Sequence, residues 1–330
     1  MANPTRSDVH VNRPLTQISI AFLQSAMNFV AGRVFPNIPV MKQSDLYFTY
    51  PRGSFNRDEM KLRAPSTESA GGGYDVGSDS YSAKVYAFHK DIDDQLRANS
   101  DAPIDLDREA TAYVTTKGLI KREKLWVSSF FATGVWTTDI TGVSGSPGSG
   151  QVKQWNDDAS TPIEDVATAK SAILESTGFE PNVLTVGYPV WQQLKRHPDI
   201  LDRIKYGGGI SPSSPAIVTL QSVAALFEVD RINVMKAIEN TADEGQTAAH
   251  SFIGGKKAML CFAAPNPGIM TPSAGYTFSW TGYTGAGPEG NRINRLRMDP
   301  IKSDRIEIEM AFDMKKVSAD LGYFWDSIVA

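Results

Sequence analysis

Residues 180–206 restrict the fold of this 330-residue chain strongly, because they set a strand, a turn and two short helices in a fixed order. A short run rich in β-branched residues, Val183 to Val186, predicts a strand that Gly187 ends. Pro189 follows where the first turn of a helix tolerates a missing N–H. Pro198 biases His197 away from the helical region, so the first helix stops there. A second apolar helical stripe then runs out at three glycines (Ile200, Leu201 and Ile204; Gly207 to Gly209).

Composition is that of a folded globular protein without a general affinity for nucleic acid. Hydrophobic residues make up 41% of the chain and charged residues 21%, and the net charge is −4. Residues 1–63 are an exception, with eight Lys or Arg against four acids, which suggests a basic arm that meets acidic surfaces elsewhere. The single cysteine, Cys261, lies in an apolar run, so we expect an inert buried thiol and a reducing compartment. Neither a signal peptide nor a membrane span is expected.

Residues 44–90 carry the strongest sign of assembly. Leu46, Phe48 and Tyr50 alternate on one expected strand, and Val85 and Ala87 alternate on another. The connection between them, residues 52–79, is rich in charge and glycine, and such a two-stranded projection is marginal alone in water. We therefore expect it to be either disordered or laid upon a partner. The preceding residues, 1–43, are punctuated by prolines and predict an arm that needs another surface to become ordered.

Residues 105–132 predict one long helix of roughly 40 Å, with acids near its start and lysines and arginine further on. Gly118 should weaken this helix by about 1 kcal/mol relative to alanine. Residues 161–280 alternate helices and strands, including a helix with a predicted capping box at Thr161 and a stop at Gly178. Residues 305–314 alternate apolar and mostly acidic residues, as in a strand with one buried face. The fold class is therefore α+β.

Several short motifs resemble nucleotide-binding or metal-binding sites, but the residues around them do not complete such sites. Gly285 to Gly290 matches the dinucleotide fingerprint, but the residues that follow are strand-like and predict a loop. The acidic trio Asp91, Asp93 and Asp94 lacks the later ligands of a calcium loop. The four histidines have no zinc-ligand spacing (His10, His89, His197 and His250). We therefore expect no enzyme activity, no catalytic or metal residues and no cofactor.

The segment 180–206, together with the order of the other segments, resembles the A-domain and the overall layout of tailed-phage major capsid proteins with the Hong Kong ninety-seven fold. The resemblance implies an N-terminal arm at 1–43, an extended E-loop hairpin at 44–90, a P-domain at 91–160 with its spine helix at 105–132, an A-domain at 161–300, and a C-terminal P-domain strand and tail at 301–330. It also implies hexamers and pentamers that form an icosahedral head around double-stranded DNA.

Two groups of charged residues are candidates for contacts between subunits. The first lies at the tip of the expected E-loop, where a solvated loop is the alternative (Arg57, Asp58, Glu59, Lys61 and Arg63). Some relatives cross-link their shells through a lysine in this loop, but nothing in the sequence identifies a partner for Lys61. The second group is Arg292, Arg295 and Arg297, which we expect to pair with a neighbour's carboxylates rather than with packaged DNA.

The resemblance also sets expectations about partners and location. The chain begins at Met1 without a scaffolding segment, so we expect a separate scaffolding protein and no amino-terminal processing. Other expected partners are a portal protein and non-specifically held DNA, with assembly in the host cytoplasm, location in the virion and no membrane contact. A decoration protein, covalent cross-linking, the triangulation number, the host and the tail type stay open. The alternatives are an encapsulin, a cellular nanocompartment shell, and a dinucleotide-dependent enzyme that rests on residues 285–290 alone.

Overall fold

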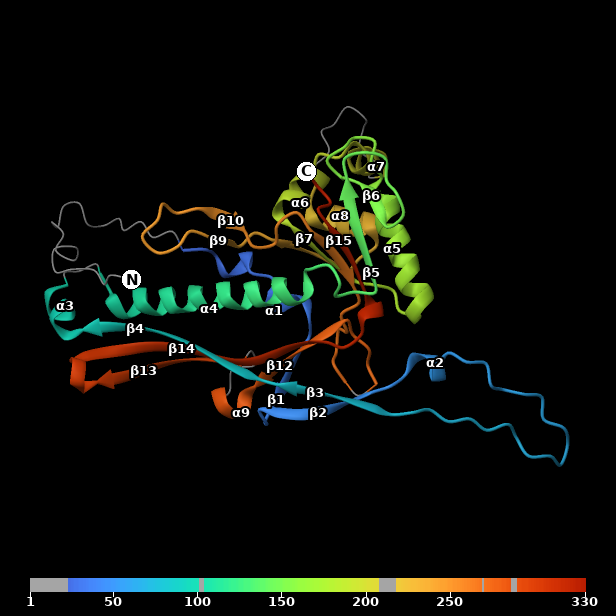
Figure 1. Ribbon diagram of the computed structural model, residues 1–330, viewed down its shortest axis with the longest axis horizontal. Helices are drawn as coiled ribbons and strands as arrows, with labels where there is room; N and C mark the ends of the chain where they lie inside the picture. The colour runs from blue at the N-terminus through green and yellow to red at the C-terminus, as the bar shows by residue number, and fades with distance from the viewer. Residues whose placement is uncertain (1–22, 101–103, 208–217, 269, 286–289) are drawn as a thin grey trace.

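The computed structural model describes residues 23–100, 104–207, 218–268, 270–285 and 290–330. Its main parts are two β-sheets, one carrying a long helix and the other several shorter helices (Figure 1). A two-stranded hairpin projects toward the lower right of the view, and a second small hairpin lies above the long helix. No helix among the described residues is both long and apolar enough to cross a bilayer.

The five-stranded sheet is built around β14 (Ser303–Lys316), which pairs antiparallel with three other strands. The remaining strands are β1 (Asn37–Val40), β4 (Lys84–Asp93), β12 (Gly275–Trp280) and β13 (Asn291–Met298). As predicted, β14 alternates, and its buried face carries Ile306, Ile308, Met310 and Phe312. Helix α4 (Leu106–Phe130) packs on that face, which confirms the long helix predicted from the sequence.

Gly118 has a structural reason that the sequence did not reveal. A Cβ at this position would lie 3.0 Å from Cδ1 of Ile308 and 3.3 Å from Sδ of Met310. The glycine therefore lets α4 approach β14 closely, in return for its weaker helix propensity.

The six-stranded sheet has the strand order β6-β5-β15-β11-β7-β8 and is covered by helices α5 to α8. Its strands are β5 (Thr138–Val143), β6 (Gln151–Lys153), β7 (Val183–Gly187), β8 (Arg231–Met235), β11 (Ala258–Cys261) and β15 (Gly322–Asp326). Its helices are α5 (Pro162–Thr177), α6 (Tyr188–Leu194), α7 (Pro198–Gly207) and α8 (Leu220–Phe227). The strand and two helices predicted at 180–206 are thus confirmed as β7, α6 and α7.

The smaller elements connect these layers. The projecting hairpin consists of β2 (Ser44–Thr49) and β3 (Gly77–Ser82), and the second hairpin consists of β9 (Ile238–Asn240) and β10 (His250–Phe252). The short helical turns are η2 (Ala26–Asn28), α1 (Ala31–Val34), α2 (Arg52–Phe55), α3 (Asp94–Asn99), α9 (Thr281–Thr284), η3 (Asp299–Ile301) and η4 (Ala319–Leu321). The largest hydrophobic core joins the C-terminal end of α4, through Trp126 and Phe130, to the six-stranded sheet.

Two expectations about local structure are wrong. The strand containing Val85 and Ala87 does not pair with β2, because it forms β4 and pairs with β14 over ten residues. The true partner of β2 is β3, whose sequence GSDSYS has no apolar alternation to reveal it. Thr161 makes no side-chain cap at α5, although Gly178 ends that helix in the left-handed region as expected.

The sheets also cross the segment boundaries expected at residues 160 and 300. Strands β5 and β6, expected in the P-domain, join the six-stranded sheet rather than the sheet beneath α4. Strands β12 and β13, expected in the A-domain, join the five-stranded sheet instead. Strand β15, expected in a tail, lies in the middle of the six-stranded sheet because its apolar run is buried on both faces. The described part of the expected arm is also ordered within the chain, since β1 pairs with β12 and Phe35 is buried.

Candidate assembly surfaces

The connection between β2 and β3, residues 50–76, extends away from the body of the molecule (Figure 1). Every residue from 55 to 80 is exposed. Met60 and Leu62 are 93% and 102% exposed, although both are large apolar side chains. Soluble monomers rarely present such side chains on an extended projection, so this segment has the character of a surface that another molecule covers.

The root of this projection is packed on itself and is linked to the body by one ion pair. Tyr50, Phe55 and Tyr74 form an aromatic cluster with ring centroids 5.1–6.2 Å apart. Arg52 of α2 forms an ion pair of 2.9 Å with Asp320 of η4. The ion pair connects the root of the hairpin to the turn η4 before β15.

The five charged candidates predicted at the tip are all exposed there and lie close in sequence (Arg57, Asp58, Glu59, Lys61 and Arg63). Arg57 and Glu59 form an exposed pair at 3.4 Å, and Arg63 donates to the carbonyl of Thr67 at 2.6 Å. Among the described residues, no ion pair joins Lys61 to an acid. Exposed pairs of this kind contribute little to the stability of the subunit itself.

The three predicted arginines on β13 have partners within their own chain. Arg292 Nε lies 2.5 Å from Glu309 Oε2, and its guanidinium lies 4.5 Å from the ring centre of Tyr283. Arg295 and Arg297 join a cluster at the far end of the sheet. Acids of the same chain therefore pair with all three arginines, and the expected pairing with a neighbour's carboxylates stays a prediction.

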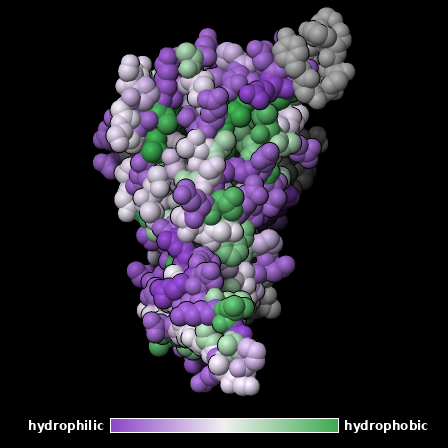
Figure 2. All heavy atoms as spheres, turned by 90° about the vertical axis from the view of Figure 1, so that its right-hand side faces the viewer, coloured by the Kyte–Doolittle hydropathy of each residue, from purple (hydrophilic) through white to green (hydrophobic). Residues whose placement is uncertain are grey.

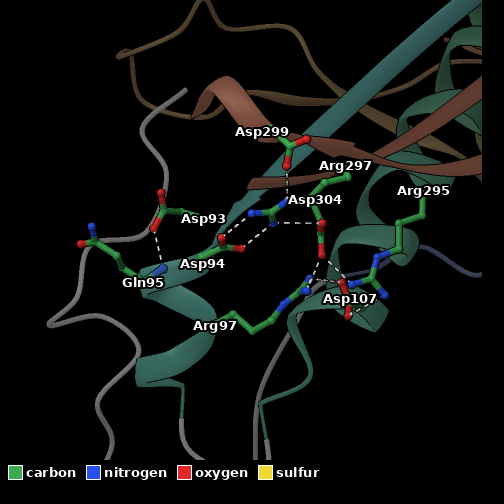
Figure 3. A network of polar contacts seen from close by, with 9 residues as sticks. All are labelled: Asp93, Asp94, Gln95, Arg97, Asp107, Arg295, Arg297, Asp299 and Asp304. Carbon is green, nitrogen blue, oxygen red and sulfur yellow. Dashed lines mark hydrogen bonds and ion pairs between the residues drawn. The ribbon is translucent and has the colours of Figure 1, made fainter. Parts of the chain in front are cut away.

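Asp304 is the centre of that cluster, which Figure 3 shows. Its side chain is only 10% exposed and accepts from Arg295 at 2.6 Å, from Arg97 and, at 3.3 Å, from Arg297. These hydrogen bonds, those from Arg295 and Arg97 above all, hold the pKa of the Asp304 carboxyl far below its usual range. Arg297 also binds Asp94 at 2.6 Å. The cluster ties α3 and the start of α4 to the β13–β14 turn.

The acidic trio considered for calcium is occupied by other interactions. Asp91 binds Arg305 at 2.8 and 2.9 Å, and Asp93 caps α3 by accepting the amide N–H of Gln95 at 2.7 Å. Asp94 binds Arg297. Within the described ranges, no group of three His, Cys, Asp or Glu side chains could hold a metal ion.

One pair that resembles a nucleophile and its base was not found from the sequence. Ser160 Oγ lies 3.0 Å from Nε2 of the buried His197. However, Nδ1 of His197 accepts the amide N–H of Asp199 at 3.2 Å, which assigns the ring proton to Nε2. The imidazole therefore donates toward Ser160 and the carbonyl of Asp157, and it cannot take a proton from the serine. The pair links the start of α7 to the loop before α5.

The glycine motif and the cysteine also lack a catalytic arrangement. Gly285 ends α9 and Gly290 is followed directly by strand β13, whereas a phosphate cradle requires a helix; residues 286–289 lie outside the described ranges. This disagrees with the dinucleotide-enzyme alternative. Cys261 is fully buried, and burial raises the pKa of its thiol to about 12.

The chain is similar over nearly its whole length to two curated phage proteins. It is 24% identical over 331 residues to the major capsid protein of Burkholderia phage BcepMu, covering 96% of both chains. It is 25% identical over 341 residues to the major capsid protein of Pseudomonas phage JBD67, covering 97% of both. No family model matches the chain.

Solved structures show the same fold at low sequence identity. A phage-related protein from Bordetella bronchiseptica RB50 superposes with a TM-score of 0.66 and 21% identity, covering 91% of this chain and 92% of that chain. The capsid of cyanophage P-SCSP1u gives 0.61 and 10%, covering 98% of both. The holo-SrpI encapsulin complex of Synechococcus elongatus PCC 7942 gives 0.55 and 12%, covering all of this chain and 98% of that one. These likenesses confirm the α+β capsid fold predicted from the sequence.

Proposed function

We propose that this chain, which has the Hong Kong ninety-seven fold of tailed-phage major capsid proteins and is similar along its length to two of them, assembles with copies of itself into the shell of a phage head. On this proposal its function is geometric rather than catalytic. Identical subunits form hexamers and pentamers, and their head-to-tail contacts curve into a closed icosahedral container for double-stranded DNA.

The observation that carries the proposal is the projection between β2 and β3, which is exposed along residues 55–76. A two-stranded hairpin of this length has too little of its own core to stay ordered in water, and its tip presents Met60 and Leu62 to solvent. Covering these side chains with a second subunit removes apolar surface from water. The charged tip residues flank this apolar pair and are suited to ion pairs with the neighbour (Arg57, Asp58, Glu59, Lys61 and Arg63).

The same proposal assigns roles to the other parts of the chain. The β2–β3 projection corresponds to the E-loop, α4 to the spine helix, the five-stranded sheet to the P-domain and the six-stranded sheet to the A-domain. Further partners are a separate scaffolding protein, a portal protein and packaged DNA held without sequence preference, with assembly in the host cytoplasm. The net charge of −4 suits a lining that does not grip DNA.

Electron microscopy of the expressed chain with its scaffolding protein tests the proposal. We expect closed particles from the natural chain. A variant in which residues 56–73 are replaced by a short Gly-Ser linker should give folded subunits, with unchanged circular dichroism, that form no particles. As a matched control, Gly145→Ala changes a loop residue with open space around it and should leave assembly intact. Closed particles from the shortened variant would contradict the role given to the projection.

An encapsulin shell is the second candidate, because the Synechococcus encapsulin complex shares the fold over the whole chain. The contents of purified particles distinguish the two. Nuclease-protected DNA in particles made with the phage portal and packaging proteins supports the phage head. Particles from the native source that hold a folded protein cargo and no DNA would support the encapsulin instead.

A further inference from the structure

An apolar groove lies in the inside corner between the root of the β2–β3 projection and the end of α5. Its volume is about 850 Å³. Its lining includes the projection root with Tyr50 and Phe55, Phe179 just after α5, and a segment before β12 with Met270. Phe278 and Leu321 form part of its wall.

Two of the polar residues that line the groove, Arg52 and Tyr276, already have partners within the chain. Arg52 is the one charged residue among its described lining residues, and it is paired with Asp320 at 2.9 Å. The hydroxyl of Tyr276 donates to the carbonyl of Thr271 at 2.8 Å. A charged small molecule would therefore find few hydrogen-bonding partners, whereas apolar side chains would match the surface.

The exposed apolar surface of the groove is about half of what one side of a stable interface needs. Phe48, Phe55, Phe179 and Met270 are 71%, 48%, 39% and 55% exposed. Large side chains of this kind carry about 150–250 Å² each, so together they leave roughly 400 Å² of apolar surface in water. A standard interface buries about 800 Å² on each partner. The exposed projection beside the groove can supply the remainder.

The projection does not cover its own groove. Figure 1 shows it running outward from the corner, and about ten extended residues on each side place its tip roughly 30 Å from the root. The side of the molecule on which it extends carries several separate hydrophobic patches among hydrophilic residues (Figure 2). The occupant must therefore come from another molecule or from a part of the chain outside the described residues.

We propose that this groove is an acceptor surface for a second copy of the chain, whose body sits in the corner between α5 and the projection. This inference rests on the proposed shell function. Because groove and projection lie on the same side, one copy engages both at once, and their areas add into a single interface. One neighbour occupies the groove of a given subunit, and the opposite side of that subunit occupies the groove of the neighbour beyond it. Such head-to-tail contact closes into rings.

Thiol labelling tests the proposal, because Cys261 is buried and gives little background. In a Met270→Cys variant, we expect the new thiol to react at least ten-fold more slowly in assembled shells than in free subunits. Leu220→Cys on α8, which is 39% exposed and away from the groove, serves as the comparison for general effects of labelling. Phe179→Cys provides a second groove position if the first variant fails to assemble.

Each outcome separates this inference from the proposed function. Equal rates at Met270→Cys in shells and free subunits would overturn the groove assignment and leave shell formation standing. Slow labelling in free subunits that becomes fast when residues 1–22 are removed would identify the chain's own terminus as the occupant, which also overturns it. Met270→Asp should raise the concentration needed for assembly at least ten-fold, whereas Leu220→Asp should not. Failure of the natural chain to form particles at all would instead refute the proposed function.

Discussion

Replacing Glu123 with alanine should destabilise the subunit strongly, because this buried carboxylate of α4 caps the short helix α1. Its Oε2 atom accepts the backbone N–H groups of Val30 and Ala31 at 2.9 and 2.8 Å. Glu123 is fully buried, and Val30, at the start of α1, provides no side-chain cap of its own. The carboxylate therefore fixes the residues before β1 onto α4.

The size of the effect follows from these contacts. Two buried N–H groups would lose their acceptor, and each unsatisfied group costs about 1–2 kcal/mol. The space left by the shorter side chain adds about 1 kcal/mol, so the loss should be about 3–5 kcal/mol. Globular proteins unfold with free energies of about 5–15 kcal/mol. Glu123→Ala should thus remain folded but unfold at a clearly lower urea concentration.

Glu123→Gln separates the hydrogen bonds from the charge. Its amide oxygen can still accept from the two N–H groups. Burial raises the pKa of Glu123 above its ordinary value of 4.5. The native state therefore binds this proton more tightly than the unfolded state. The resulting stabilisation is fully present below pH 4.5 and is lost as pH rises through the native pKa. Glutamine does not titrate. The stability of Glu123→Gln relative to the natural chain should therefore increase as pH rises above 4.5.

Urea unfolding of free subunits, followed by tryptophan fluorescence, measures both effects, since Trp126 lies one turn along the same helix. Ser129→Ala, at an exposed position on α4, is the control and should change stability by less than about 0.5 kcal/mol. A loss below about 1 kcal/mol for Glu123→Ala at pH 7 would refute the reasoning, because the N–H groups would then have found other acceptors.

Three further predictions concern single residues in the body of the subunit. Gly187→Ala should prevent stable folding, because its Cβ would lie 1.9 Å from a backbone oxygen, whereas Gly145→Ala, with open space around it, should leave the thermal melting temperature nearly unchanged. Hydrogen bonds from arginine lower the pKa of Asp304, so the stabilisation by its carboxylate should be present above pH 3.8 and lost as pH falls through the native pKa. Asp304→Asn should therefore lower the melting temperature at neutral pH, and the difference from the natural chain should shrink in acid. The more exposed Asp299→Asn should lower the melting temperature less. Cys261 should resist a thiol reagent at pH 8 in folded subunits and react fully in denaturant; rapid labelling of the folded chain would contradict its burial.

Elements with strong local signals could be predicted from the sequence. Helix α4 has a long periodic pattern with acids first, and β14 alternates apolar and polar residues along its length. The strand and helices at 183–207 are separated by glycine and proline, which act locally. In each case the information lies within the element itself.

Pairings between distant segments could not be predicted in the same way. Strand β3 has almost no apolar residues, so nothing in it indicates β2 as its partner. Arg297 meets Asp94 across 203 positions, and neither charged residue indicates the other as its partner in the sequence. The composition of the loop tip predicts an assembly surface, whereas the groove cannot be predicted from the sequence, because its lining comes from segments spread over most of the chain.

Helix α4 makes the body of the subunit rigid, so on the proposed function the projection and the groove are the parts expected to adjust during assembly. One end of α4 is anchored in the aromatic core of the six-stranded sheet, and the other is tied to the ion cluster through Asp107 and Arg97 at 2.7 Å. Between them, Gly118 seats the helix on β14 and Glu123 holds the segment around α1. The body is therefore braced along its length. If the chain forms the proposed hexamers and pentamers, we expect such a subunit to adapt by changing how its edges meet, so the contacts at the projection root should differ more between the two environments than any contact of α4.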